Sequence, residues 1–181
     1  MQQTQPRAVT LVLGGARSGK SRFAQRIAER ASSVAFVATA KAIDDEMRDK
    51  IRRHQQERPN HWRTVEEPLE LARVVVECGP QCEVLLVDCL TLFVANVLEA
   101  GPEMLDARID GVIDALRTVE TSVVLVSNEV GSGIVPAYPL GRQFQDLLGE
   151  VNQRVASVAD NVLFMVAGLP LALKGQIEVR P

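Results

Sequence analysis

The stretch "AVTLVLGGARSGKS", residues 8–21, gives the most specific indication of the fold in this sequence. Its first part, residues 8–13, is mostly apolar and β-branched, which is typical of a buried strand. The following residues, 14–21, match the pattern G-x-x-x-x-G-K-[ST]. An amphipathic run, "KSRFAQRIAERA" (20–31), then predicts a helix. A strand before the pattern and a helix after it are the context that a phosphate-binding loop requires.

Such a loop binds a polyphosphate mainly through its backbone. Gly14 and Gly19 let the chain turn and approach the phosphates, so that successive N–H groups and the start of the helix surround the phosphate oxygens. We expect Lys20 to reach the β and γ phosphates and Ser21 to bind Mg²⁺. The predicted nucleotide-binding residues of this loop are Gly14, Gly15, Ala16, Arg17, Ser18, Gly19, Lys20 and Ser21.

Beyond the loop, short apolar runs alternate with longer helical patterns, which is typical of βαβ units on a mainly parallel sheet. Strands are predicted at 8–13, 34–38, 83–88, 122–127 and 161–167, with a last one near 177–179 as a hairpin at the sheet edge. Helices are predicted at about 20–31, 44–57, 68–77, 103–119 and 141–158. The sequence thus predicts an α/β fold, a mainly parallel sheet flanked by helices with a short antiparallel edge, in a single nucleotide-binding domain, 1–181.

Charge, cysteine spacing and hydropathy argue against nucleic-acid binding, a disulfide-bonded or zinc-binding protein, and a membrane protein. The net charge of −3 gives no basic footprint, so no nucleic-acid partner is expected. The spacing of Cys78, Cys82 and Cys89 fits neither an even disulfide framework nor a zinc pattern, which favours reduced thiols in a cytoplasmic protein. The apolar run near the N-terminus is too short for a membrane span or for the core of a signal peptide.

A second candidate for the nucleotide site is Asp88, which ends the apolar run "EVLLVD" (83–88). A carboxylate at the carboxyl tip of a buried strand can bind Mg²⁺, directly or through water; the alternative is a helix N-cap. Asn128 and Glu129 follow another predicted strand, at the sheet edge where open α/β sheets gather their sites. A plain turn is the alternative for "SNEVGSG" (127–133), which lacks the Asn-Lys-x-Asp element typical of regulatory GTPases.

Both histidines of the chain lie in "RRHQQERPNHW", residues 52–62. Helical spacing places His54 on one stripe with Met47 and Ile51, so this stripe faces protein or a cleft in it. His61 lies beyond the end of the predicted helix, where packing is its expected role. The two histidines, seven residues apart, have no cysteine or carboxylate to complete a metal site.

Cations surround His54 on the predicted helix, namely Lys50, Arg53 and Arg58. Nearby positive charge disfavours the imidazolium form and so lowers the pKa of an imidazole. The same cations attract a triphosphate, and a neutral imidazole beside an α-phosphate can form a covalent phosphoramidate. The residues alone leave two alternatives open, a structural histidine and a substrate contact.

Several blocks of sequence, covering nearly the whole chain, resemble one known family. They are "LGGARSGKSRFA" (13–24), "ATAKAIDDEM" (38–47), "KIRRHQQERPNHWRTVEEP" (50–68), "LLVDCLT" (85–91), "SNEVGSGIVP" (127–136) and "GRQFQDLLGEVNQRVASVAD" (141–160). Together they look like the bifunctional adenosylcobinamide kinase / adenosylcobinamide-phosphate guanylyltransferase family of cobalamin biosynthesis. Some members place Glu where this chain has Asp88, and relatives with two adjacent histidines correspond here to Arg53-His54.

The resemblance implies two reactions at one nucleotide site. The γ-phosphoryl group of ATP or GTP passes to adenosylcobinamide, and GMP from GTP is then joined to that phosphate through a guanylylated histidine, with release of pyrophosphate. The family's nucleophile falls on His54, and Mg²⁺ on Ser21 and Asp88. The other nucleotide-binding residues that the resemblance implies are Thr39, Ala40, Lys41, Gln55, Gln56, Glu57, Arg58, Glu66 and Asp88.

The resemblance further implies a recombinase-like P-loop NTPase fold and a homo-oligomer, commonly a trimer, with a corrinoid substrate. The sequence does not identify the residues that bind the corrin ring, and the first candidates are residues 128–136. Two other functions stay open. The first is a P-loop small-molecule kinase in which His54 only contacts phosphate, and the second is a nucleotide-binding regulatory protein.

Overall fold

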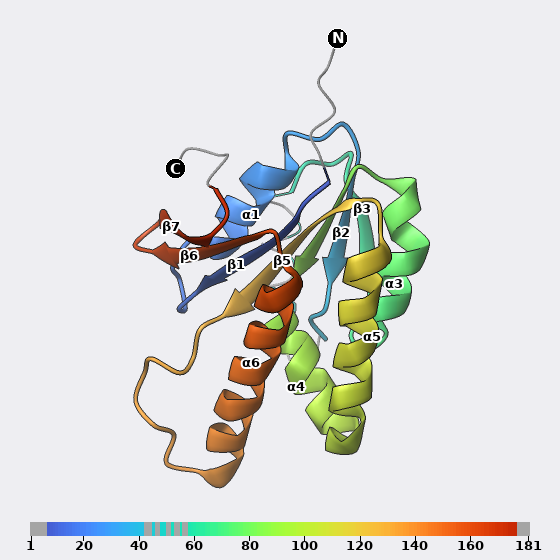
Figure 1. The fold of residues 1–181 in the computed structure, drawn as a ribbon. Helices are drawn as coiled ribbons and strands as arrows, with labels where there is room; N and C mark the ends of the chain where they lie inside the picture. Colours follow the sequence, from blue (N-terminus) through green and yellow to red (C-terminus); the bar gives the residue numbers. More distant parts are fainter. Residues whose placement is uncertain are drawn as a thin grey trace.

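The computed structural model describes residues 7–41, 45, 48–49, 52, 55 and 58–176, and these contain one seven-stranded sheet in the order β3-β2-β4-β5-β1-β6-β7 (Figure 1). Strands β1 to β6 run parallel, and β7 pairs antiparallel with β6. The strands are β1 (Val9–Gly14), β2 (Val34–Ala38), β3 (Arg63–Glu66), β4 (Val84–Asp88), β5 (Ser122–Asn128), β6 (Asn161–Val166) and β7 (Leu169–Lys174). The predicted fold class is confirmed.

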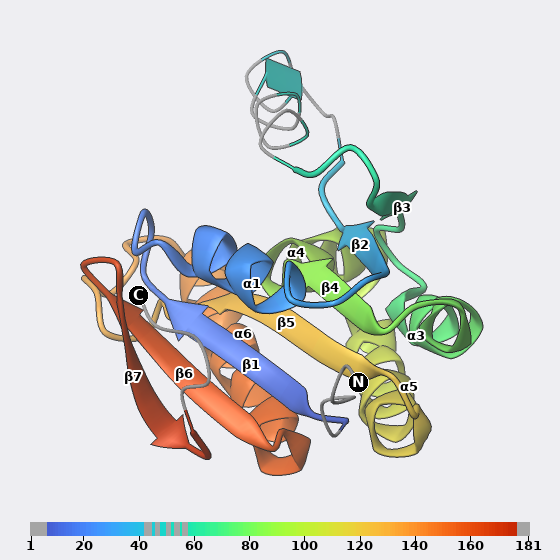
Figure 2. The ribbon, with the colours of Figure 1, turned by 90° about the horizontal axis from the view of Figure 1, so that it is seen from above.

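Helices cover both faces of this sheet (Figure 2). One face is covered by α1 (Lys20–Ala28), and the other by α3 (Leu71–Cys78), α4 (Leu90–Ala100), α5 (Leu105–Thr118) and α6 (Pro139–Val158), with two short 3-10 helices, η1 (Gly79–Gln81) and η2 (Pro102–Met104). Successive side chains of a strand point to opposite faces. Leu11 and Leu13 therefore pack with the helices of the second group, whereas Val12 packs with α1.

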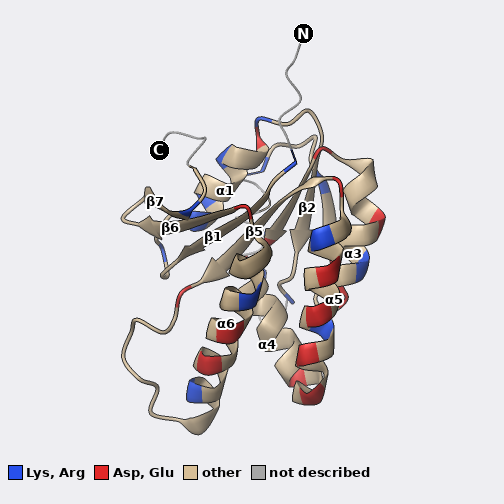
Figure 3. Cartoon of the chain, in the orientation of Figure 1, with Lys and Arg blue, Asp and Glu red and all other residues tan. Residues whose placement is uncertain are grey.

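Charged residues lie on the outer faces of the helices, as α5 and α6 show in Figure 3. Arg154 of α6 pairs with Asp106 at 3.3 Å and with Asp110, both on α5. The two helices are amphipathic, and their predicted positions are confirmed within two residues at each end. Pro139 begins α6, where its missing N–H costs nothing.

Three elements differ from the prediction: α4 and β3 were not predicted, and the antiparallel edge strand was predicted at other residues. The run "LTLFVANVLEA" forms α4, whose nearly continuous apolar sequence hides the helical period. The mostly polar segment "RTVE" forms β3 at the sheet edge. The antiparallel edge strand is β7, formed by Leu169–Lys174, whereas the predicted strand at 177–179 lies outside the described residues.

The helix predicted at 44–57 falls mostly on residues that the structure does not describe. Those that it does describe, Asp45, Arg48, Asp49, Arg52 and Gln55, are helical and exposed. The three cysteines are free thiols. No helix within the described part of the chain is long and apolar enough to cross a membrane.

Candidate active site

The loop between β1 and α1 has the geometry of an anion-binding nest. Arg17 and Gly19 have positive φ values, 57° and 91°, and the Ser18 N–H donates to the Gly15 carbonyl at 3.3 Å. Alternation of right- and left-handed backbone turns successive N–H groups toward one point, and α1 adds the positive end of its dipole. Lys20 Nζ donates to the Gly15 carbonyl at 3.0 Å, so its ammonium lies over the loop.

Close packing fixes the loop in this shape. A Cβ atom on Gly14 would lie 2.4 Å from Ser18 Oγ and 2.9 Å from the Met165 carbonyl oxygen. The turn between β6 and β7 also supports the loop, because the Gly168 N–H donates to the Ser18 carbonyl at 3.0 Å. This support joins residues 150 positions apart and has no local signal, so the sequence pattern did not reveal it.

Two predicted carboxylates lie in one row at the carboxyl ends of the strands. Ala38 of β2 pairs in register with Glu66 of β3 on one side and with Asp88 of β4 on the other. Since Phe36 and Leu86 belong to the core cluster beneath α1, strand alternation directs Glu66 and Asp88 to that same face. Glu66 is exposed and Asp88 is half-buried. The row thus faces the side of the sheet on which the phosphate loop leads into α1.

Electrostatics connect this row with the loop. Burial and, to a smaller extent, the neighbouring Asp88 carboxylate together raise the pKa of the Cys89 thiol to about 11, whereas Lys20 acts to lower it. Lys20 is therefore close enough to interact with the residue that follows β4. In the sheet, only β5 separates β4 from β1, the strand that ends in the loop. The predicted partners Lys20 and Asp88 accordingly lie on the same face and edge.

Arg58, which lies outside the sheet, adds a cation to the row of carboxylates. Its guanidinium carbon lies 3.5 Å from the centroid of the Phe36 ring, a cation–π contact. Burial lowers the pKa of Arg58, and the carboxylates of Asp88 and Glu66 act in the opposite direction. Within the described residues, Nε and one terminal nitrogen of Arg58 have no hydrogen-bond partner. Arg58 thus lies near enough to two carboxylates to interact with their charges and keeps donors without a partner among the described residues, although no sequence pattern pairs it with Phe36.

The segment 39–41 makes mainly structural contacts. Thr39 is fully buried, and its hydroxyl donates to the Cys89 carbonyl at 2.7 Å and accepts from the Cys89 N–H at 2.8 Å. Its side chain thereby joins the ends of β2 and β4 and fixes the position of Asp88. Lys41 pairs with Glu99 of α4 at 3.2 Å, and Ala40 is half-buried. The predicted nucleotide contact of this segment stays a prediction.

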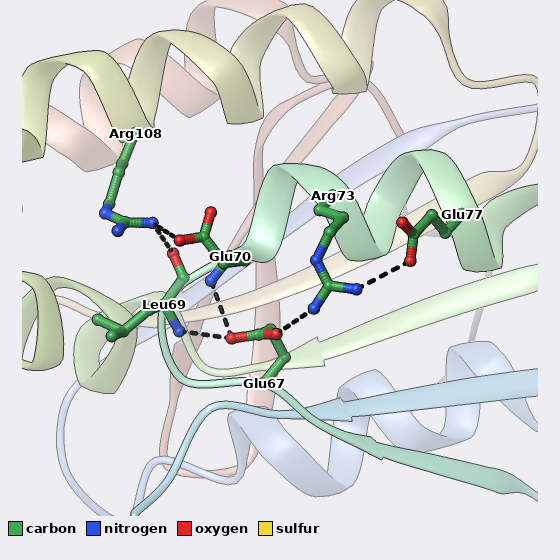
Figure 4. A network of polar contacts seen from close by, with 6 residues as sticks. All are labelled: Glu67, Leu69, Glu70, Arg73, Glu77 and Arg108. Atoms are coloured by element: carbon green, nitrogen blue, oxygen red, sulfur yellow. Dashed lines mark hydrogen bonds and ion pairs between the residues drawn. The ribbon is translucent and has the colours of Figure 1, made fainter.

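Glu67, beside the predicted site residue Glu66, anchors the end of β3 (Figure 4). Its Oε1 accepts the backbone N–H groups of Leu69 at 3.0 Å and Glu70 at 2.9 Å, and its other oxygen pairs with Arg73 at 2.7 Å. The Glu67 N–H itself donates to the Ala38 carbonyl at 2.9 Å. In the "EEP" motif, one glutamate faces the candidate site and the next fixes the chain that carries it.

The residues predicted around the nucleophile are only partly described. His54, Gln56 and Glu57 lie outside the described residues, and Gln55 is exposed on the helical segment. After Pro59 the chain turns and buries Trp62, with 7% of its surface exposed, in the cluster beneath α1. His61 is exposed, so the packing role expected for it is wrong.

Sequence reasoning also missed the surroundings of Asn128. Thr91 of α4 accepts the Asn128 N–H at 2.8 Å, and Asn152 of α6 donates to its carbonyl at 3.0 Å. Both are polar residues that are buried on otherwise apolar helix faces. A buried polar residue at an apolar position is a signal that is visible in the sequence once the helix is known.

Comparison with solved structures supports the fold. The RadB recombinase matches 97% of this chain and 84% of its own, with a TM-score of 0.57 and 15% sequence identity. An ATPase of the type III secretion system of pathogenic bacteria matches 91% of this chain and 56% of its own, with a TM-score of 0.56 and 11% identity. These likenesses show a P-loop NTPase fold.

Comparison of sequences identifies the family. Residues 10–173 match the family described as cobinamide kinase / cobinamide phosphate guanyltransferase. The "Bifunctional adenosylcobalamin biosynthesis protein CobP" of Pseudomonas aeruginosa is 45% identical over 168 residues, which is 92% of this chain and 97% of the relative. The "Bifunctional adenosylcobalamin biosynthesis protein CobU" of Escherichia coli is 40% identical over 179 residues, 91% of this chain and 98% of the relative. The chain therefore belongs to the cobinamide kinase / cobinamide phosphate guanyltransferase family of enzymes.

Proposed function

We propose that this enzyme phosphorylates adenosylcobinamide with ATP or GTP and then transfers GMP from GTP to adenosylcobinamide phosphate, giving adenosylcobinamide-GDP and pyrophosphate. One observation carries the proposal. In a protein of this family, the phosphate loop, Asp88, Glu66 and Arg58 all lie at one edge of the sheet. We further propose that residues 1–181 act as one nucleotide-binding domain, because a single sheet runs through the described part.

In this proposal the loop residues 14–21 bind the triphosphate. Their backbone N–H groups contact phosphate oxygens, and Lys20 contacts the β and γ phosphates. Arg58 adds the donors that have no partner within the described residues, which suits a phosphate placed between it and Lys20. Residues 39–41 and 55–57 border the same nucleotide.

Ser21 and Asp88 would hold Mg²⁺. The residues present suit this ion, since Ser21 lies in the first turn of α1 beside the loop and Asp88 ends β4 on the α1 face, both with oxygen donors. Mg²⁺ in such sites takes one or two protein oxygens and completes its shell with phosphate oxygens and water. When bound, it neutralises negative charge that develops on the phosphates.

His54 is the proposed nucleophile of the second reaction. One imidazole nitrogen forms a bond to the α-phosphorus of GTP while the bond from that phosphorus to the α,β-bridging oxygen breaks, and pyrophosphate leaves with the electron pair. An oxygen of adenosylcobinamide phosphate then attacks the same phosphorus and releases the histidine. Arg58, four residues after His54, supports this placement because its guanidinium lies near Asp88 and Glu66.

We propose a homo-oligomer, and a trimer on the family resemblance. Apolar side chains on the β6–β7 hairpin favour association, because Val166, Leu169, Leu171 and Leu173 are each more than half exposed. The loop after β5 carries a further group, including Ile134 with 97% of its surface exposed, which suits the apolar face of a corrinoid. We place the reactions in the cytoplasm, where free thiols such as these three persist.

The two reactions are tested separately with purified protein. Cobinamide with ATP and Mg²⁺ should give cobinamide phosphate, and cobinamide phosphate with GTP and Mg²⁺ should give the GDP-linked product with pyrophosphate. Lys20→Ala should abolish both, and Lys174→Ala, on the far β7, should abolish neither. Formation of cobinamide phosphate without the second product would support the plain kinase. Nucleotide binding without either product would support the regulatory protein.

A further inference from the structure

The end of β5 lies at the centre of the candidate active site. In the sheet, β5 lies between β1, which leads into the phosphate loop, and β4, which ends in Asp88. Its last residue, Asn128, pairs in register with Gly14, the first residue of the loop, and the next N–H, of Glu129, donates to the Gly14 carbonyl at 3.1 Å. A ligand that extends from the loop toward Asp88 must therefore pass the tip of β5.

The Asn128 side chain belongs to the face of the sheet that carries the nucleotide site. Val124 and Val126 pack in the cluster beneath α1, so the alternation of the strand directs Asn128 to the same side. Ser127, which is fully buried, points to the side of α6. Asn128 is half-buried, and the hydrogen bonds found for it within the described part of the chain involve its backbone and not its side-chain amide.

The backbone of Asn128, in contrast, is held by two helices that cover the other face of the sheet, α4 and α6. The Thr91 hydroxyl of α4 accepts its N–H at 2.8 Å, and the Asn152 amide of α6 donates to its carbonyl at 3.0 Å. Gln145 of α6 donates to the carbonyl of Val130, two residues further on, at 2.9 Å. Two buried polar residues thus fix a backbone whose side chain stays available, which is how a preorganised donor is built.

We propose that Asn128 is a catalytic residue of the kinase reaction, with its side-chain amide donating a hydrogen bond to the terminal phosphoryl group during transfer. This inference rests on the proposed function and deepens it. In the step, the acceptor hydroxyl oxygen bonds to the γ-phosphorus while the bond from that phosphorus to the β,γ-bridging oxygen breaks. The nucleoside diphosphate leaves with the electron pair, and the hydroxyl proton passes to solvent. The amide of Asn128 only donates a hydrogen bond and exchanges no proton.

Because of the position of Asn128, loss of its amide is expected to affect the kinase reaction and not the guanylyl transfer. The γ-phosphate is the group that Lys20 and the metal site hold beyond the loop, and the tip of β5 lies between these two. The guanylyl transfer instead breaks the bond between the α-phosphorus and the α,β-bridging oxygen and leaves the bonds of the γ-phosphoryl group intact. Loss of the amide is therefore expected to slow phosphoryl transfer and to leave attack on the α-phosphorus largely unchanged.

The test compares Asn128→Ala and Asn128→Asp with wild type and with Gln153→Ala, which removes an exposed amide from α6. Two rates are measured on each protein under saturating nucleotide, formation of cobinamide phosphate and formation of the GDP-linked product from supplied cobinamide phosphate. We expect kcat of the kinase reaction to fall about 100-fold in both Asn128 variants, the effect of removing one transition-state donor. The second rate should stay within about threefold, with Gln153→Ala at wild-type values for both.

Two results would overturn the inference. Kinase rates within about threefold of wild type in Asn128→Ala would show that the amide is not used, and equal losses of both reactions would show a general structural or binding role. Thermal unfolding of each variant excludes loss of fold as the cause. Failure of the proposed function is distinct, because the wild-type protein itself would then lack the kinase product.

Discussion

Replacing Glu67 tests the claim that this residue fixes the end of β3. Its carboxylate accepts two backbone N–H groups, from Leu69 and Glu70, just before α3 begins. Glu67→Ala leaves both without their acceptor, a loss comparable to removal of a helix cap, about 1 to 2 kcal/mol. The ion pair with the exposed Arg73 adds little, because water screens it. For a chain of this length the melting temperature should fall by roughly 2–8 °C.

The charge of Glu67 adds a pH dependence with a defined sign. Burial acts to raise the pKa of Glu67, but the N–H donors of Glu70 and Leu69, together with Arg73, outweigh it and lower the pKa below its ordinary value of 4.5. The folded state thus favours the carboxylate, so this stabilisation is fully present above pH 4.5 and is lost as the pH falls through the lowered value. Glu67→Gln should be less stable than wild type at neutral pH and should approach it in acid.

Both the loss of stability and its pH dependence are measured by thermal unfolding, monitored by circular dichroism at pH values from 7 down through the ordinary pKa of a glutamate. Glu77→Gln is the matched control. It removes the other carboxylate that pairs with Arg73 but leaves the acceptor of the Leu69 and Glu70 N–H groups in place. It should melt with wild type at every pH. If Glu67→Ala melts at the same temperature as wild type, or if the difference between Glu67→Gln and wild type grows in acid, the Glu67 carboxylate does not stabilise the end of β3.

Three further changes test other parts of the site. Gly14→Ala should lose nucleotide affinity by calorimetry, because its Cβ would lie 2.4 Å from Ser18 Oγ, whereas Gly149→Ala, with open space around it, should bind normally; equal affinities would contradict the packing account. Asp88→Asn should raise the Mg²⁺ concentration for half-maximal activity by about tenfold or more, whereas replacement of the exposed Asp114 of α5 by Asn should not. An unchanged Mg²⁺ requirement in Asp88→Asn would remove Asp88 from the metal site. Cys89, with a pKa raised to about 11 by burial and Asp88, should resist thiol labelling at pH 8 in the native protein and react in urea, as peptide mapping would show; rapid native labelling of Cys89 would contradict this.

The phosphate loop was predictable because its pattern is local. Residues 14–21 contain their own turn chemistry, and the apolar run before them and the amphipathic run after them indicate a strand and a helix. The same holds for Asp88, which ends an apolar run at a strand tip, and for Pro139, which begins α6. Each of these predictions uses residues that are neighbours in the chain.

The remaining parts of the site depend on strand order and on contacts between distant residues. Arg58 lies on Phe36, and Asn128 is held by Thr91 and Asn152, but these pairs are set by which strands and helices lie side by side. The helix α4, which supplies Thr91, is apolar on most of its surface and lacks the stripe that marks an amphipathic helix. Its omission from the prediction therefore hid one of the residues that position Asn128.

The covalent step at His54 can be detected with labelled GTP. The wild-type protein, His54→Asn and His61→Asn are incubated with Mg²⁺ and GTP labelled at the α-phosphate, denatured and freed of nucleotide. We expect acid-labile, alkali-stable label on the wild type and on His61→Asn, which changes the exposed second histidine, and none on His54→Asn. Label that persists on His54→Asn, or a wild-type protein that forms the GDP-linked product without becoming labelled, would contradict it.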